Sequence, residues 1–206
     1  HPQGRPVRMS FVLGLTGSIG MGKSTTAQMF ADEGLPVWDA DATVHRLYQP
    51  GQPAALAVKA LFPTAIDPDG QVNRTTLRAL IQADKTVLDR LNAAVHPLVA
   101  ADRAAFLLAN DSTGILLLDV PLLYEIGLER ACDAVAVVTA PADVQRDRVM
   151  SRGQMTEAEF ETILSRQIPD AEKRRRADYI IPTTSLEAAR QAVKDVLADI
   201  RRTRHA

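Results

Sequence analysis

Residues Gly17 to Ser24 read Gly-Ser-Ile-Gly-Met-Gly-Lys-Ser, the full Gly-x-x-x-x-Gly-Lys-Ser spacing of a phosphate-binding P-loop. The apolar run Phe11–Leu15 precedes the loop and predicts a strand, and residues Lys23–Ala31 predict a helix. Glycines let backbone amides approach phosphate closely, and a helix start favours negative charge. The motif in this context therefore predicts a polyphosphate site rather than a chance glycine-rich turn.

Each position of the loop has an expected role. Lys23 should reach the β- and γ-phosphates, and the Ser24 hydroxyl should bind Mg²⁺ directly. The chain lacks the Asn-Lys-x-Asp motif of a GTPase and any transport-ATPase signature. The other nucleotide-binding candidates supply backbone amides or, in one case, a hydroxyl: Gly17, Ser18, Ile19, Gly20, Met21, Gly22 and Thr25.

Short apolar runs alternate with helical patterns, which predicts an α/β fold with a mainly parallel five-stranded sheet flanked by helices. The runs lack polar alternation, as strands buried on both faces do. They are Phe11–Leu15, Leu35–Trp38, Ile115–Val120, Ala134–Val138 and Tyr179–Ile181. The expected helices include Ala42–Tyr48, Pro53–Phe62, Arg74–Ala83, Pro97–Ala109, Pro141–Arg152 and two that follow the capping-box pairs Thr156/Glu159 and Thr184/Glu187.

Composition narrows the class of protein. With 24 basic and 25 acidic residues, the net charge of −1 gives no basic field for nucleic acid. No apolar run reaches 18 residues, so we expect no membrane span. The N-terminal segment has no apolar h-region followed by a small-residue cleavage site, so we expect no secretory signal. The single cysteine, Cys132, cannot form an internal disulfide, which fits a cytoplasmic protein. We set residues 1–8 aside as a tail before a start at Met9, and the pattern favours neither a monomer nor a small homo-oligomer.

Two aspartates, Asp39 and Asp41, follow the second apolar run. Ligands bind at the carboxyl ends of parallel strands, and a phosphoryl acceptor needs a group that orients it and takes its proton. Asp41 directly precedes the helix expected from Ala42, so one of the two could serve only as a helix cap. We favour Asp41 as the catalytic carboxylate.

Asp119 ends the third run after four apolar residues, in the manner of a Walker B strand. We expect it to hold Mg²⁺ through water, unless it is a turn residue at the end of a strand. Of the 19 arginines, seven fall between Arg146 and Arg176. Guanidinium groups suit polyphosphate, and the alternative is an exposed helical face.

Together these residues resemble the bacterial dephospho-coenzyme A kinases, from about Phe11 to Arg202. The most specific elements are Asp39-Ala40-Asp41, His96-Pro97 and Asp119-Val120-Pro121-Leu122-Leu123 with Glu125. Further matching elements are Leu15-Thr16 before the P-loop, His45, Asp69-Gly70 with Arg74 and Leu77, Arg148, Arg152 and Arg166-Gln167.

The resemblance implies the fold of nucleoside monophosphate kinases. Its parts would be a P-loop core (residues 9–44, 113–140 and 177–206), a helical CoA-substrate-binding domain (45–112) and a helical lid (141–176). It also implies the last step of coenzyme A synthesis, in which ATP phosphorylates the ribose 3′-hydroxyl of dephospho-CoA to give CoA and ADP. ATP and Mg²⁺ would be the cofactors, and ATP and dephospho-CoA the small-molecule partners.

The family likeness also assigns roles to individual residues. The implied catalytic set is Asp41 as base or orienting carboxylate, Lys23, Thr16 beside the transferred phosphate, and Arg148 as a lid arginine. Arg148 and Arg152 would also bind the nucleotide. The implied substrate-binding residues are Asp39, Asp41, His45, Arg74, His96, Leu122 and Glu125.

Several of these assignments have a plainer alternative. His96 could belong to a helix start, because Pro97 suits a first turn. His45 lies one helical turn after Asp41 and could pack instead of facing the site. Arg74 could lie on an exposed face of an amphipathic helix.

The chain departs from the family pattern in one segment. The family usually has an asparagine near the fifth run, in a segment that lines the adenine pocket. Here residues 181–185 read Ile-Pro-Thr-Thr-Ser. We therefore expect recognition of the base to be looser than recognition of the phosphates.

Two other functions stay open on these residues. One is a kinase of another small metabolite on the same fold, because the helical insert sets the acceptor. The other is a nucleotide-binding regulator, which would bind ATP but release no ADP with any acceptor.

Overall fold

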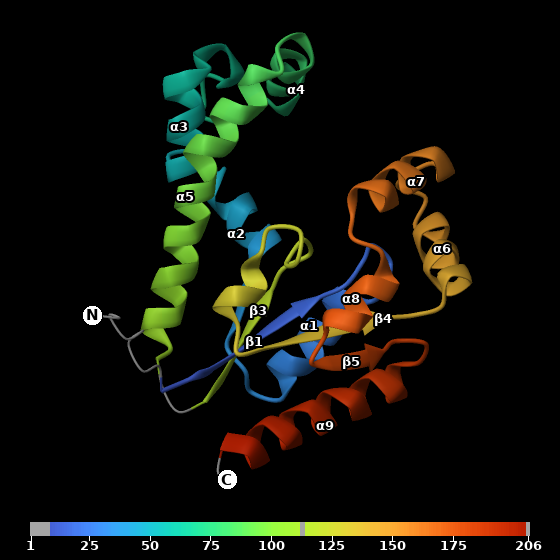
Figure 1. The fold of residues 1–206 in the computed structure, drawn as a ribbon. Helices are drawn as coiled ribbons and strands as arrows, with labels where there is room; N and C mark the ends of the chain where they lie inside the picture. Colours follow the sequence, from blue (N-terminus) through green and yellow to red (C-terminus); the bar gives the residue numbers. More distant parts are fainter. Residues whose placement is uncertain (1–8, 112–113, 205–206) are drawn as a thin grey trace. The chain divides into compact units, whose positions relative to one another are not determined.

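The computed structural model describes residues 9–111 and 114–204 (Figure 1). They form two compact units: one runs to Trp38 and resumes at Asn110, and the other is Asp39–Ala109. The tail that we set aside, residues 1–8, lies outside the described residues. Within the described ranges, no helix combines the length and the apolar character needed to cross a bilayer.

Five strands form one parallel sheet in the order β2-β3-β1-β4-β5, which confirms the predicted fold class. The inner strands are buried almost throughout, as their lack of polar alternation predicts. Leu15 pairs with Asp119, so the P-loop leaves β1 level with the end of β3. The strands are β1 (Phe11–Thr16), β2 (Val37–Asp39), β3 (Ile115–Asp119), β4 (Ala134–Thr139) and β5 (Tyr179–Pro182).

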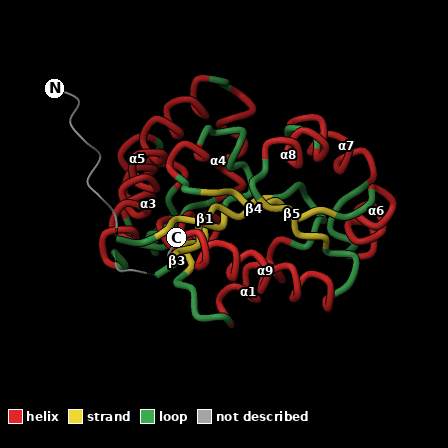
Figure 2. Tube along the Cα trace, turned by 60° about the horizontal axis from the view of Figure 1, so that its bottom comes forward, coloured by secondary structure: helices red, strands yellow, loops and turns green. Residues whose placement is uncertain are grey.

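Helices cover both faces of this sheet (Figures 1 and 2). α1 (Lys23–Asp32) and α9 (Leu186–Arg204) lie side by side on one face, and α8 (Asp170–Arg176) lies on the other. Buried residues of α1, α9 and the strands form one apolar core, which fixes the sheet beneath the P-loop. The same unit contains α6 (Ala142–Ser151), α7 (Glu157–Arg166) and the short 3₁₀ helix η2 (Leu128–Ala131).

The Asp39–Ala109 unit is helical and has a core of its own. Leu47, Val58, Leu77, Leu91 and Val95 are among the buried residues that its helices contribute to this core. The elements are α2 (Ala40–Leu47), α3 (Pro53–Leu61), η1 (Pro63–Ala65), α4 (Arg74–Ala83) and α5 (Thr86–Ala109).

The start of α5 corrects the sequence interpretation. We expected a helix from Pro97, but α5 begins at Thr86 and contains Pro97 in its interior. The buried residues Val87, Leu91 and Val95 recur at four-residue spacing, so packing of one helical face overrides the local cost of a proline. His96 is therefore a mid-helix residue and not part of a helix start.

Two helix caps also differ from expectation. α2 begins at Ala40, and its cap is Asp39, whose carboxylate accepts a 3.0 Å hydrogen bond from the Ala42 amide. α9 is capped by the Ser185 hydroxyl, which accepts from the Ala188 amide, rather than by Thr184. The Thr156 and Glu159 capping box at α7 is confirmed. Since Asp39 caps α2, Asp41 is not the cap of this helix.

Candidate functional site

The P-loop connects β1 to α1 through backbone that few residues other than glycine adopt. Gly20 has a φ of 76° and Gly22 a φ of 87°, both in the left-handed region. A Cβ on Gly17 would come within 2.2 Å of Val138 Cγ2, so a side chain there would collide with β4. The loop therefore needs glycine at these positions for conformational and for steric reasons.

Lys23 and Asp119 form an ion pair at the carboxyl end of the sheet. Lys23 opens α1, and Asp119 is the last residue of β3 and only 3% exposed. Thr16, at the end of β1, is fully buried, and its hydroxyl donates a 3.0 Å hydrogen bond to the Pro121 carbonyl. The structure thus brings three predicted residues together, with Thr16 joining the P-loop strand to the segment after β3.

The donor atoms at this point suit a hard cation with few protein ligands. The Ser24 side chain is exposed in the first turn of α1. The Asp119 carboxylate lies close to the same loop, because it is paired with Lys23, the residue before Ser24. Over the described ranges, no group of three or more His, Cys, Asp or Glu residues could hold a metal ion. Mg²⁺ at phosphoryl-transfer sites takes one or two protein oxygens and completes its shell with phosphate and water, so the pair Ser24 and Asp119 fits it.

A cavity of about 260 Å³ adjoins the P-loop on the side of α9. Arg148 and Arg152, both from the α6 end of the segment 141–176, line it together with the segment after β5. Its full lining is Gly22, Thr25, Thr26, Arg148, Arg152, Thr183, Ser185, Leu186 and Ala189. The two arginines chosen from the sequence therefore share one cavity with the start of α1.

Most other arginines of the cluster have surface ion pairs, as the alternative of an exposed helical face predicts. Arg146 pairs with Glu157 and Glu161, and Arg174 with Asp170. Arg175 and Arg176 both pair with Glu172, and their hydrogen bonds lower the pKa of that carboxyl to about 2. These arginines therefore pair on the exposed surface of the segment 141–176.

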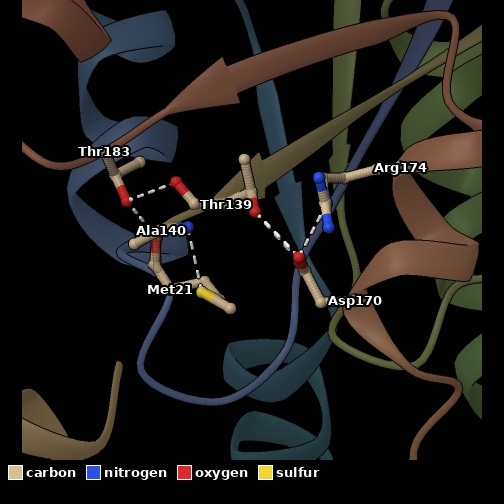
Figure 3. A network of polar contacts seen from close by, with 6 residues as sticks. All are labelled: Met21, Thr139, Ala140, Asp170, Arg174 and Thr183. Atoms are coloured by element: carbon tan, nitrogen blue, oxygen red, sulfur yellow. Dashed lines mark hydrogen bonds and ion pairs between the residues drawn. The ribbon is translucent and has the colours of Figure 1, made fainter. Parts of the chain in front are cut away.

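Thr183 belongs to the segment in which the family usually has an asparagine, and its side chain faces the P-loop. Its hydroxyl donates to the Met21 carbonyl at 2.5 Å and lies 3.2 Å from the Thr139 carbonyl (Figure 3). Arg148 donates to the carbonyl of Thr183 and, at 3.2 Å, to its hydroxyl oxygen. Thr183 therefore joins β4, the P-loop and α6.

A second polar group lies nearby, between β4 and α8. The Thr139 hydroxyl donates to the Asp170 carboxylate, which also pairs with Arg174 (Figure 3). These residues line a separate cavity of about 470 Å³, and residues 22 to 25 are not part of its lining. Since it shares only Met21 with the loop, we assign no nucleotide contact to it.

Glu125 contacts the returning part of the segment 141–176. Its Oε2 accepts a 3.0 Å hydrogen bond from the Ile168 amide and lies 3.0 Å from Lys173 Nζ. Lys173 is fully buried, and its side chain is 0% exposed against 14% for Glu125. We had assigned Glu125 to the substrate on the family likeness. We did not predict a role for Lys173, because it opens a Lys-Arg-Arg-Arg run and only its burial distinguishes it from the three arginines. Leu122, also assigned to the substrate, is exposed.

The remaining substrate candidates belong to the Asp39–Ala109 unit. Asp41 and His45 are exposed and lie one turn apart on α2, where His45 is next to Gln49. Arg74 opens α4 and partly offsets the rise that burial causes in the pKa of Tyr48. His96 is exposed on α5. These side chains are thus available to a ligand.

Comparison with known proteins gives one consistent family. The dephospho-CoA kinase family model matches residues 11–188. A dephospho-CoA kinase from Cereibacter sphaeroides is 62% identical over 193 residues, which cover 94% of this chain and 97% of the relative. A crystal structure from Thermus thermophilus aligns with a TM-score of 0.79 at 33% identity, covering 92% of this chain and 97% of that one. Dephospho-CoA kinase from Campylobacter jejuni shares the fold, with a TM-score of 0.67 at 23% identity over 93% and 98% of the two chains.

Proposed function

The chain belongs to the dephospho-CoA kinase family, and we propose that it transfers the terminal phosphoryl group of ATP to the ribose 3′-hydroxyl of dephospho-CoA. The products are CoA and ADP. The Lys23–Asp119 pair carries this proposal, because it joins the P-loop lysine to the strand-end carboxylate that phosphoryl transfer uses.

The P-loop amides and Lys23 bind the phosphates of ATP. Lys23 exchanges its contact with Asp119 for the β- and γ-phosphates, which frees the Asp119 carboxylate. Ser24 and Asp119 would hold the ion, which neutralises charge on the phosphates when bound. Arg148 and Arg152 hold the nucleotide in the cavity of about 260 Å³ that they line.

We assign the acceptor to the helical insert, residues 45–112, with Asp39 and Asp41 before it. Asp41 takes the proton of the 3′-hydroxyl while the new oxygen–phosphorus bond forms and the bond to the bridging oxygen of ADP breaks. His45, Arg74, His96 and Leu122 bind the acceptor. The segment 141–176 acts as the lid, and Arg148 and Arg152 neutralise charge in the transition state.

Glu125 and Thr16 have different roles in this proposal from those that the family likeness implied. Both Ile168 and Lys173 contact the Oε2 atom of Glu125, so we assign this residue to anchoring the lid. The hydroxyl of Thr16 is occupied by Pro121, so we assign it to positioning the P-loop strand. Neither group needs to touch a substrate to affect the rate.

A panel of acceptors tests the proposal. A coupled assay of ADP release compares dephospho-CoA, AMP and shikimate at equal concentration with purified full-length protein. We expect ADP release with dephospho-CoA alone. Release with AMP or shikimate and not with dephospho-CoA would assign the chain to another acceptor, and release with none would favour a regulator.

A further inference from the structure

Four side chains hold the outer side of the P-loop, one for each of four successive peptide groups. Gln167 Oε1 accepts from the Ile19 amide at 3.3 Å, and Gln145 Nε2 donates to the Ile19 carbonyl at 2.7 Å. Arg148 Nη1 donates to the Gly20 carbonyl at 3.4 Å, and Thr183 Oγ1 to the Met21 carbonyl at 2.5 Å. The peptide groups that begin at residues 18, 19, 20 and 21 are thus each fixed by a different side chain.

These contacts act where the backbone is least constrained. Gly20 has a left-handed φ and no side chain, so its peptide groups rotate more easily than those of other residues. The C=O and N–H of one peptide group point in opposite directions, so the held carbonyls of Ile19 and Met21 direct the amides of Gly20 and Gly22 toward the space that phosphate occupies. The amides of Ile19 and Met21 instead donate to Gln167 and to the Ser18 carbonyl. A loop held in this way does not have to be reorganised when the anion binds.

The holding residues are themselves fixed. Gln145 is 5% exposed and packs on Gly20, where a Cβ would meet Val149 Cγ2 at 2.7 Å. Gln167 ends α7, and the next amide, that of Ile168, donates to Glu125. Thr183 is 8% exposed and follows β5. The outer contacts therefore come from packed elements rather than from mobile surface groups.

We propose that Gln145 and Thr183 are positioning residues that keep the amides of Gly20 and Gly22 directed at the phosphates of the nucleotide. Gln145 in α6 and Gln167 after α7 both belong to the segment 141–176, so this segment and the P-loop share one hydrogen-bonded frame. The proposal goes beyond the transfer reaction. Only its consequence for turnover rests on the proposed function, because ordering of the P-loop acts on nucleotide binding itself.

The two glutamines give a matched test, because their partners fix which atom each one uses. Gln167 must accept from an amide, whereas Gln145 must donate to a carbonyl. Gln167→Glu therefore keeps the hydrogen bond, and Gln145→Glu replaces a donor by a carboxylate that faces a carbonyl oxygen. Both variants add one negative charge next to Ile19, so the comparison sets a carboxylate that keeps its hydrogen bond against one that loses it and faces a carbonyl oxygen.

The readout is the Kd of ADP by titration calorimetry, which needs no acceptor. Since a neutral hydrogen bond contributes about 0.5–1.5 kcal/mol, we expect Gln145→Glu to bind ADP about 3- to 10-fold more weakly than Gln167→Glu. Equal Kd values for the two variants would overturn the proposal. If Gln145→Glu does not fold, Gln145→Ala replaces it, with the same excess weakening over Gln167→Glu expected.

Thr183 gives an independent test of the proposal, with the neighbouring residue Thr184 as the control. Thr183→Val removes only the hydroxyl and should weaken ADP binding about 3- to 10-fold, whereas Thr183→Ser should stay near wild type. Thr184→Val makes the same change at the exposed next residue and should leave the Kd within about twofold. A wild-type Kd in Thr183→Val would contradict the proposal. Loss of transfer to dephospho-CoA in the wild-type protein would instead count against the proposed function.

Discussion

Glu125 gives the sharpest prediction about how this unit is held together. Glu125→Gln keeps the shape of the side chain and an oxygen that can accept from the Ile168 amide. It removes the negative charge beside Lys173, whose side chain is 0% exposed. Lys173 is then a buried cation without its carboxylate, and we expect the variant to be strongly destabilised.

The expected magnitude follows from the burial of the pair. Removing one partner of a buried ion pair costs about 3–5 kcal/mol. Because Glu125 is 14% exposed, we take the lower end, about 3 kcal/mol. For a chain of this size, each kcal/mol lowers the melting temperature by about 2–4 °C, so the expected decrease is about 6–12 °C.

Thermal unfolding of three variants checks the reasoning. The double variant Glu125→Gln/Lys173→Met has no buried charge at this point and should recover most of the loss, because an apolar replacement of a buried pair is often neutral. Arg202→Met breaks an exposed pair with Asp199 and should cost under about 1 kcal/mol. If Glu125→Gln keeps its melting temperature and instead raises the KM of dephospho-CoA, Glu125 binds substrate and the anchoring role is wrong.

Three further predictions concern the site and its surface. Asp41→Asn should reduce transfer by at least about 100-fold, the usual contribution of acid–base catalysis, with ATP binding intact; wild-type turnover would refute the assignment. Glu172 has a pKa of about 2, below its usual 4.5, so its contribution to stability is present above pH 4.5 and is lost as the pH falls toward 2. The melting temperature of Glu172→Gln should therefore depend less on pH over that range than the melting temperature of the wild type. Because the Thr183 hydroxyl is bonded to the P-loop, we expect no contact from it to the base, and kcat/KM with GTP within about 10-fold of that with ATP, the value of one such contact; strict ATP preference would count against this.

The sheet and the P-loop were predictable because their signals are local. Apolar runs without alternation marked all five strands to within one or two residues, and the glycine spacing marked the loop. Here the local pattern and the tertiary structure agree. The motifs placed Lys23 and Asp119 at the ends of two parallel strands, but they assigned Lys23 to phosphate and Asp119 to Mg²⁺, so the direct ion pair of the two was not predicted.

The sequence failed where tertiary packing decides the outcome. Pro97 suggested a helix start, but the buried stripe of α5 continues through it. Lys173 reads as one cation in a basic run, and only its burial beside Glu125 distinguishes it. The contacts of Gln145 and Gln167 with Ile19 join residues more than 120 positions apart, and no spacing rule connects them. The roles proposed for Asp41, His45, Arg74 and His96 stay predictions.

The central claim is that the P-loop core phosphorylates the 3′-hydroxyl of dephospho-CoA. The most direct test compares dephospho-CoA with its 3′-deoxy analogue and measures ADP release and acceptor phosphorylation together. Our account predicts one CoA for each ADP with dephospho-CoA, and only background ADP with the analogue. Equal ADP release with both acceptors, or ADP without CoA, would contradict it.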